Sequence, residues 1–250
     1  MTSAPNHSTT HAPGQLKAVC LDVDDTLLDT QRASRQGLRE LVGTDRAWPV
    51  WERTTDHYYA RFVNDELDFE AMCVERTKAF FAAFGEQIDD TEAARRESVR
   101  MAAMQSAWGL FDDARPCLDW LRDSGVRLAV ITNAPSTYQR KKIAAVGLAD
   151  VFDAVVISGE VGVAKPDPRI FRTACDALGL RPDEVAHVGD RLDTDARGAA
   201  RAGLHGVWLD RSRSERGTVG DVPVITSLHE LPELLVGDLP AIPAMPELIG

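Results

Sequence analysis

An apolar segment that ends in a run of acids limits what this chain can fold into. Residues 16–29 read Leu-Lys-Ala-Val-Cys-Leu-Asp-Val-Asp-Asp-Thr-Leu-Leu-Asp, and the apolar first half is typical of a buried strand. Asp22 and Asp24 therefore crowd at the carboxyl edge of that strand, where like charges repel unless a cation neutralises them. Oxygen ligands at a strand end suit Mg²⁺, and an aspartate can also act as a covalent nucleophile toward phosphorus. Most isolated Asp-x-Asp pairs are simply surface acids that end a strand, so the rest of the chain has to decide.

The acidic balance of the chain argues against a nucleic-acid partner. The 250 residues carry a formal net charge of −11 at pH 7, whereas nucleic-acid binding requires a basic face. A small anionic substrate is compatible with this charge if positive residues gather locally. The sequence has no apolar run long enough to span a membrane, so we expect no membrane partner.

Both ends of the sequence are expected to lie outside the fold. Residues 1–15 lack the basic start and apolar core of a secretory signal, and we expect a disordered leader in which His7 and His11 are solvated. Residues 236–250 are rich in proline and are expected to form a loose tail. The cysteines are widely spaced within apolar patterns, which indicates buried, reduced thiols and a cytoplasmic protein; they are Cys20, Cys73, Cys117 and Cys175.

Residues 30–111 have a helical pattern and are expected to form an all-helical insert. One apolar stripe of this insert contains Phe69, Met72, Cys73, Phe80 and Phe84. Arg76 interrupts the stripe on a face that should be buried, where an unpaired charge would be costly. Arg76 therefore either pairs with an acid of the insert, or faces the site and meets a phosphate or carboxylate of the substrate.

From residue 112 onwards the pattern alternates between strands and helices. Buried strands are expected over residues 126–132, 154–158, 185–188 and 206–209, with helices between them. One of these helices should begin with Asp167 as its cap and Pro168 as its first residue, and should end at Gly179. This alternation predicts an α/β fold with a doubly wound parallel sheet, in which residues 16–29 and 112–235 form the core.

Ligands of doubly wound sheets bind beyond the carboxyl ends of the strands. Four stretches of this chain place polar groups at that edge of the predicted sheet. The groups are Asp22 with Asp24, Thr132 with Asn133, Lys165, and Asp190. Each has an ordinary structural alternative: a hydroxyl that closes a turn, a surface lysine, or an acid that caps a helix. Together they supply a nucleophile, a second acid, a hydroxyl, an ammonium group and a metal-binding carboxylate, which are the groups that phosphoryl transfer needs.

Four motifs of the chain resemble those of the haloacid dehalogenase-like (HAD) hydrolase superfamily. In chain order they are Asp22-Val-Asp24-Asp-Thr26-Leu, Val-Ile-Thr132-Asn, Gly-Val-Ala-Lys165-Pro-Asp-Pro and Val-Gly-Asp190-Arg-Leu-Asp-Thr-Asp195. The resemblance extends from Leu16 to Leu235, and the helical insert is similar to the C1 cap of that superfamily. It implies a Rossmann-like core and a phosphatase whose inserted helices cover the site.

The resemblance also implies roles for the residues of these motifs. Asp22 would attack phosphorus and form an aspartyl-phosphate, while Asp24 would protonate the leaving oxygen and then take the proton from the hydrolytic water. Thr132 and Lys165 would hold the phosphoryl oxygens, with Asn133 beside them in the substrate site.

The resemblance further implies Mg²⁺ as the cofactor. The Asp22 carboxylate, the Asp24 backbone carbonyl and Asp190 would bind the ion. Asp195, at the start of the following helix, would hold a metal-bound water.

Three positions near the motifs leave alternatives open. Asp193 competes with Asp195 for the outer position at the metal. Arg191 stands where the fourth motif often has a serine, and is either a surface residue or a further phosphate partner. Asp25 is expected to be structural.

The leading hypothesis is a Mg²⁺-dependent phosphomonoesterase that acts on a small phosphorylated metabolite. A 2-haloacid dehalogenase needs no metal and no acid to protonate a departing halide, so Asp24, Asp190 and Asp195 argue against it. A phosphomutase would hand the same aspartyl-phosphate to a second hydroxyl, and residues of the insert decide between these two outcomes. A phospho-accepting receiver module carries its accepting aspartate at the end of the third strand, where this chain has Ser158. The substrate itself and the oligomeric state stay open.

Overall fold

The computed structural model describes residues 16–64, 66–213 and 217–237. The expected leader over residues 1–15, with His7 and His11, lies outside the described residues, as does the expected tail from residue 238 onwards. Val236 and Gly237 belong to the last described helix, α10 (Leu231–Gly237).

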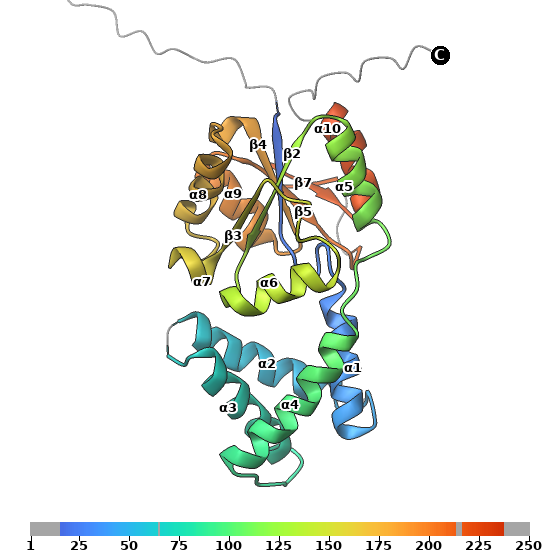
Figure 1. The fold of residues 1–250 in the computed structure, drawn as a ribbon, viewed down its shortest axis with the longest axis vertical. Coiled ribbons are helices and arrows are strands. Elements are labelled where there is room, and N and C mark those ends of the chain that lie inside the picture. Colours follow the sequence, from blue (N-terminus) through green and yellow to red (C-terminus); the bar gives the residue numbers. More distant parts are fainter. Residues whose placement is uncertain (1–15, 65, 214–216, 238–250) are drawn as a thin grey trace, which may run out of the picture.

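The strands of the described ranges form one seven-stranded sheet, which confirms the α/β fold (Figure 1). They are β1 (Ala18–Leu21), β2 (Arg127–Thr132), β3 (Ala154–Ile157), β4 (Val185–Gly189), β5 (His205–Leu209), β6 (Gly217–Val219) and β7 (Val222–Ile225). The order across the sheet is β3-β2-β1-β4-β5-β7-β6, and only the β6–β7 pair is antiparallel. The sequence pattern did not predict β6 and β7, because both are short and a proline lies within β7.

Helices cover both faces of the sheet, which explains why β1 is apolar on both sides. Val19 and Leu21 pack into one core with α5 (Ala114–Asp123) and α10, while Ala18 and Cys20 pack into a second core with α8 (Pro168–Leu178) and α9 (Arg197–Ala202). In Figure 1 these two pairs of helices lie on opposite sides of the strands. The remaining elements of the core are α6 (Ser136–Ala145), α7 (Ser158–Val161) and the short turns η1 (Pro182–Glu184), η2 (Leu192–Ala196) and η3 (Leu228–Glu230).

Helix α8 has the boundaries that its sequence predicts. The Asp167 side chain accepts a hydrogen bond from the Arg169 N–H, Pro168 is the first helical residue, and Gly179 ends the helix with a φ of 62°. The cysteines at positions 20, 73, 117 and 175 are free and buried, as expected. None of the helices among the described residues combines the length and apolarity that a membrane span requires.

The stretch between β1 and α5 is helical throughout its regular elements. It forms α1 (Thr30–Val42), α2 (Trp48–Val63), α3 (Phe69–Ala82) and α4 (Asp90–Ser106), which we call the four-helix insert. Its own core includes Trp51 and Phe80, whose rings meet edge to face at a centroid distance of 5.2 Å. Phe84, expected in a buried stripe, is 57% exposed because α3 ends before it. In Figure 1 the insert lies beyond the end of the sheet near α6, which is the carboxyl end of β1.

A close backbone approach joins β5 to the turn η2. A Cβ at Gly206 would lie only 2.0 Å from the carbonyl oxygen of Ala196, the last residue of η2. Only glycine therefore allows η2 to rest on the sheet at this point.

We expect Gly206→Ala to lower the free energy of unfolding by about 1–3 kcal/mol, because the added methyl group must displace backbone atoms. Chemical denaturation measures this change. Gly109→Ala is the matched control, since its Cβ would meet only the mobile end of the Arg32 side chain, at 2.8 Å. Equal unfolding free energies for the two variants would contradict the packing argument.

Candidate active site

The register of the three central strands brings the predicted polar groups to one edge of the sheet. Leu21 of β1 pairs with Val130 of β2 and with Val188 of β4. The one or two residues that follow these positions therefore lie close together at the end of the sheet, and they include Asp22, Thr132 and Asp190. A cavity of about 440 Å³ lies at this edge, between the sheet and the four-helix insert, and all three side chains line it.

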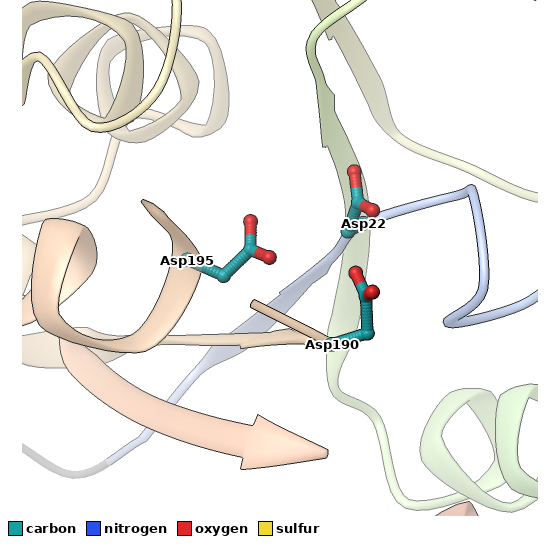
Figure 2. A group of neighbouring side chains, drawn as sticks. All are labelled: Asp22, Asp190 and Asp195. Carbon is teal, nitrogen blue, oxygen red and sulfur yellow. The ribbon is translucent and has the colours of Figure 1, made fainter. Parts of the chain in front are cut away.

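Three carboxylates form a cluster in this cavity. Asp22, Asp190 and Asp195 each offer one oxygen within 4.8 Å of the others (Figure 2). Asp22 and Asp190 follow neighbouring strands, and Asp195 reaches them from η2, a single π-helical turn. Gly189 makes room for this approach, because a Cβ there would lie 2.3 Å from Cγ of Asp195.

Lys165 joins two of these carboxylates. Its ammonium group donates to Asp22 Oδ1 at 2.7 Å, lies 2.6 Å from Asp195 Oδ1, and donates to the carbonyl oxygen of Ile131 at 2.8 Å. Asn133 fixes the backbone of Lys165 from both sides: its Oδ1 accepts from the Lys165 N–H at 2.7 Å, and its Nδ2 donates to the Lys165 carbonyl at 2.9 Å. The amide of Asn133 is thus engaged in positioning Lys165, and its contact with a substrate stays a prediction.

The cluster holds more negative charge than Lys165 can balance. Burial raises the pKa of Asp22, and the nearby Asp195 and Asp24 raise it further, although Lys165 opposes them. Burial and the charges of Asp22 and Asp195 raise the pKa of Asp190. Burial would raise the pKa of Asp195 as well, but Lys165 and His187 outweigh it and hold that pKa well below its usual range.

This donor set fits Mg²⁺. When all three acids are ionised, three carboxylates against one ammonium leave two negative charges in excess, and the three oxygens lie close together around one position. Oxygen ligands of this kind are the ones that Mg²⁺ prefers. Burial, together with repulsion among the carboxylates, raises the pKa values of Asp22 and Asp190, and a divalent cation would offset both effects.

Asp24 has a separate set of partners. Its Oδ1 accepts from Lys142 Nζ at 2.5 Å and from Thr30 Oγ1 at 2.6 Å, and its Oδ2 accepts from Gln139 Nε2 at 3.1 Å. Burial would raise the pKa of Asp24, but Lys142 and the hydrogen bonds lower it below its usual range. Gln139 also donates to Thr132 Oγ1 at 3.0 Å, so α6 joins two of the predicted residues.

The sequence analysis missed Lys142 and Gln139. The available signal was their spacing: they lie three residues apart on the helix that follows Thr132, and therefore on one helical face. Tyr59 was also missed. Its hydroxyl donates to the Asn133 carbonyl at 3.3 Å, which places α2 of the insert over the cavity.

The three positions with open alternatives are now placed. Asp193 is exposed and accepts from Arg197 Nη1 at 2.7 Å, so it lies outside the carboxylate cluster that Asp195 joins. Arg191 is exposed and lines the cavity, and its N–H donates to Asp195 Oδ2 at 3.0 Å. Asp25 adopts a φ of 55° and accepts from the Gln31 N–H at 2.9 Å, which fits a structural role.

Arg76 has features of both of its alternatives. It is buried and its Nη2 lies 2.5 Å from Oε1 of Glu97, an acid of the insert. It also lines the cavity, on the side of the four-helix insert. Contact between Arg76 and a substrate stays a prediction.

Comparisons with known proteins show which proteins the chain is similar to. A family profile described as "haloacid dehalogenase-like hydrolase" matches residues 16–203. The phosphoserine phosphatase of Thermus thermophilus is 34% identical and covers 90% of this chain and 96% of its own length. A glyceraldehyde 3-phosphate phosphatase of Methanopyrus kandleri is 43% identical, over 79% of this chain and 85% of its own. In fold, the chain resembles the HAD-hydrolase YfnB of Bacillus subtilis, with a TM-score of 0.75 at 23% identity over 89% of this chain and 99% of that one.

Replacement of Asp190 by asparagine should make the metal-free protein more stable at alkaline pH. The raised pKa, about 8 against an ordinary 3.8, means that the folded chain keeps a proton which the unfolded chain has lost. The contribution of this carboxyl to stability is therefore complete below pH 3.8 and is lost as the pH rises through about 8. At pH 8.5 and in the presence of a chelator, we expect Asp190→Asn to raise the melting temperature by about 2–4 °C, the shift that about 1 kcal/mol gives at this size.

Melting curves at pH 5 and pH 8.5 check this prediction. Asp193→Asn is the matched control, because Asp193 is an exposed acid of the same segment. The gain for Asp190→Asn should be larger at pH 8.5 than at pH 5. A gain that is independent of pH would contradict the electrostatic account of the cluster.

Proposed function

Because the chain belongs to the haloacid dehalogenase-like hydrolase family, we propose that it is a Mg²⁺-dependent phosphomonoester hydrolase acting through an aspartyl-phosphate on Asp22. Its phosphatase relatives support the reaction class. The observation that carries the proposal is the cluster of three carboxylates beside Lys165, together with Asp24, which Lys142 binds outside this cluster. We further propose that the substrate is a small phosphorylated metabolite and that the protein is cytoplasmic, since its four cysteines are free and buried.

Asp22 is the nucleophile in this proposal. Lys165 holds its Oδ1 at 2.7 Å, which keeps the carboxylate in one orientation. An oxygen of Asp22 forms the new bond to phosphorus while the bond to the leaving oxygen breaks, and water later releases phosphate from the aspartyl-phosphate. Thr132 and Lys165 contact the phosphoryl oxygens in this proposal. Asn133 and Arg76 contact other parts of the substrate.

Asp24 is the general acid and base. Despite burial, Lys142 keeps the pKa of Asp24 low in the free protein, so in this proposal the negative phosphate of the bound substrate raises that pKa and Asp24 takes up a proton. The carboxyl then gives this proton to the leaving alkoxide and later takes one from the attacking water. Thr30, Gln139 and Lys142 fix it in a single position, which is the condition for transfer of a proton at a defined atom.

Asp22, Asp190 and the backbone carbonyl of Asp24 would hold Mg²⁺, with Asp195 in the outer position. The ion would supply charge stabilisation for the phosphoryl oxygens. Asp195 is well placed for an outer role, because both of its oxygens already accept hydrogen bonds or ion pairs from the protein.

We propose that the chain divides into a catalytic core, residues 16–29 and 112–235, and a cap, residues 30–111. Two contacts support the role of the four-helix insert as a cap, because they hold it against the site. Thr30, at the start of α1, donates to Asp24, and Tyr59 of α2 donates to Asn133. A cap in this position excludes water from the aspartyl-phosphate and contacts the leaving group.

Dehalogenation of a 2-haloacid is disfavoured, because it requires neither the carboxylate cluster nor a general acid such as Asp24. Release of halide without added metal would support it instead. A phosphomutase would use the same phosphorylated Asp22, and transfer of phosphate to a second hydroxyl of the substrate would reveal it.

Removal of the nucleophile should abolish turnover. We expect Asp22→Asn to lower kcat for an aryl phosphate by about 10³-fold or more, because the amide cannot form the covalent intermediate. Removal of Mg²⁺ by a chelator should have a similar effect, reversible on addition of Mg²⁺. Asp193→Asn is the control and should retain activity; full activity of Asp22→Asn would refute the mechanism.

Replacement of Asp24 should affect poor leaving groups most. We expect Asp24→Asn to lower kcat/KM for an alkyl phosphate by about 10²–10⁴-fold, because the alkoxide then leaves without a proton. The loss for 4-nitrophenyl phosphate should be at least about tenfold smaller, since nitrophenolate needs little protonation. Steady-state kinetics with both substrates measure the two losses, and equal losses would contradict the role of Asp24 as general acid.

A further inference from the structure

Two buried arginines lie at one end of the cavity, where the four-helix insert forms its wall. Arg76 comes from α3 and Arg100 from α4, and both side chains line the cavity. They are only 6% and 2% exposed, so neither charge is solvated to any extent. The phosphoryl transfer proposed for the sheet edge does not itself require these two positive charges on the insert.

A single acid pairs with both arginines. Glu97 Oε1 accepts from Arg76 Nη2 at 2.5 Å and from Arg100 Nη2 at 2.7 Å, and its Oε2 accepts from Arg100 Nε at 2.8 Å. Thr77 also donates to Glu97 Oε2, at 3.2 Å. Glu97 is therefore fully engaged, and one positive charge of the pair stays unbalanced.

The surroundings of the arginines do not supply the missing negative charge. Both guanidinium groups stack on Trp51, at 4.5 and 4.8 Å from the ring centroid, and the adjoining cavity wall is formed by methionines, Met72, Met101 and Met104. Arg76 Nε is buried and has no hydrogen-bond partner. The other acids among the described lining residues are those of the sheet edge and Asp56, which is exposed on α2. An unbalanced, partly unpaired guanidinium in such a place is costly unless a ligand completes it.

We propose that this end of the cavity binds a carboxylate of the substrate, so that the enzyme acts on small phosphomonoesters which also carry a carboxylate. The inference rests on the proposed phosphatase function and names the substrate class for it. One carboxylate matches the single unbalanced charge, whereas a second phosphate would bring about two negative charges. The planar guanidinium also suits a carboxylate, which it can bind with two parallel hydrogen bonds.

The two ends of the cavity are joined by Tyr138 of α6. The pKa of this phenol is raised by burial and by Asp24, while Arg100 opposes the shift, so the side chain lies close enough to interact with both Asp24 and Arg100. Its ring lies 5.7 Å from Phe69 and 5.6 Å from Trp108, between centroids. A volume of about 440 Å³ is at the lower end of the usual range for ligand sites, which suits a short metabolite that spans from phosphoryl group to carboxylate.

The first test compares substrates that differ only in this group. The probes are 3-phosphoglycerate, glycerol 3-phosphate, in which CH₂OH replaces the carboxylate, and glycerol 1,3-bisphosphate, in which a second phosphate replaces it. We expect kcat/KM for 3-phosphoglycerate to exceed that for the other two by about 10- to 100-fold, the factor that a charge-assisted pair supplies. Equal values for the first two probes, or preference for the bisphosphate, would overturn the inference.

The second test removes the unbalanced charge. Arg76→Gln leaves Arg100 and Glu97 as a neutral pair, and should reduce the preference for 3-phosphoglycerate over glycerol 3-phosphate at least about fivefold. Arg95→Gln is the matched control, because Arg95 is an exposed arginine of α4 that pairs with Glu92, and it should keep the preference of the wild type. An unchanged preference in Arg76→Gln would contradict the assignment.

A third measurement does not depend on the folding of an arginine variant. Asp22→Asn protein with Mg²⁺ should bind 3-phosphoglycerate at least about tenfold more tightly than glycerol 3-phosphate in a calorimetric titration, without turnover. Equal affinities would overturn the carboxylate site alone. If wild-type protein with Mg²⁺ hydrolysed no phosphomonoester, 4-nitrophenyl phosphate included, the proposed function itself would fail.

Discussion

The site depends on one lysine ammonium among three buried carboxylates. Lys165 directly contacts Asp22 and Asp195, while Asp190 lies close to both carboxylates and has its pKa raised by burial and by their charges. If all three carboxyls were ionised, the cluster would carry two negative charges more than Lys165 balances, and the raised pKa values of Asp22 and Asp190 reflect the cost of that state. A divalent cation is the simplest species that restores neutrality without a change in the residues, and it would leave Asp22 ionised as a nucleophile requires.

The fold supplies this arrangement through backbone geometry. Parallel register aligns the ends of β1, β2 and β4, so that residues distant in sequence meet at one edge. Gly189 and Gly206 then allow η2 to approach the sheet closely enough for Asp195 to reach Lys165. On the opposite wall, the four-helix insert adds its own charges, and Tyr59 and Thr30 attach it to the core residues Asn133 and Asp24. A rigid sheet edge thus holds the residues of the proposed chemistry, and the insert is the part that we propose contacts the leaving group.

Much of this could be predicted from the sequence, because local patterns report local causes. Apolar runs predicted the parallel sheet, and the polar residues that follow them meet at one of its edges, as expected. The cap residue Asp167 and the first helical residue Pro168 predicted where α8 begins. The pairings of Lys142 with Asp24 and of Glu97 with Arg76 could not be predicted in this way. The partners are distant in the chain, and only the packing of α6 on the core and of α4 on α3 brings them together. The short strands β6 and β7 were missed because their pairing, rather than their composition, makes them strands.

Calorimetric titration of Mg²⁺ into the metal-free protein tests the charge argument most directly. Near pH 7, in two buffers of different protonation enthalpy, the account predicts one Mg²⁺ per chain with release of protons, because the ion lowers the raised pKa values of Asp22 and Asp190. Asp190→Asn should weaken this binding by at least about tenfold. Failure to bind Mg²⁺, or binding that is unchanged in Asp190→Asn, would contradict the account.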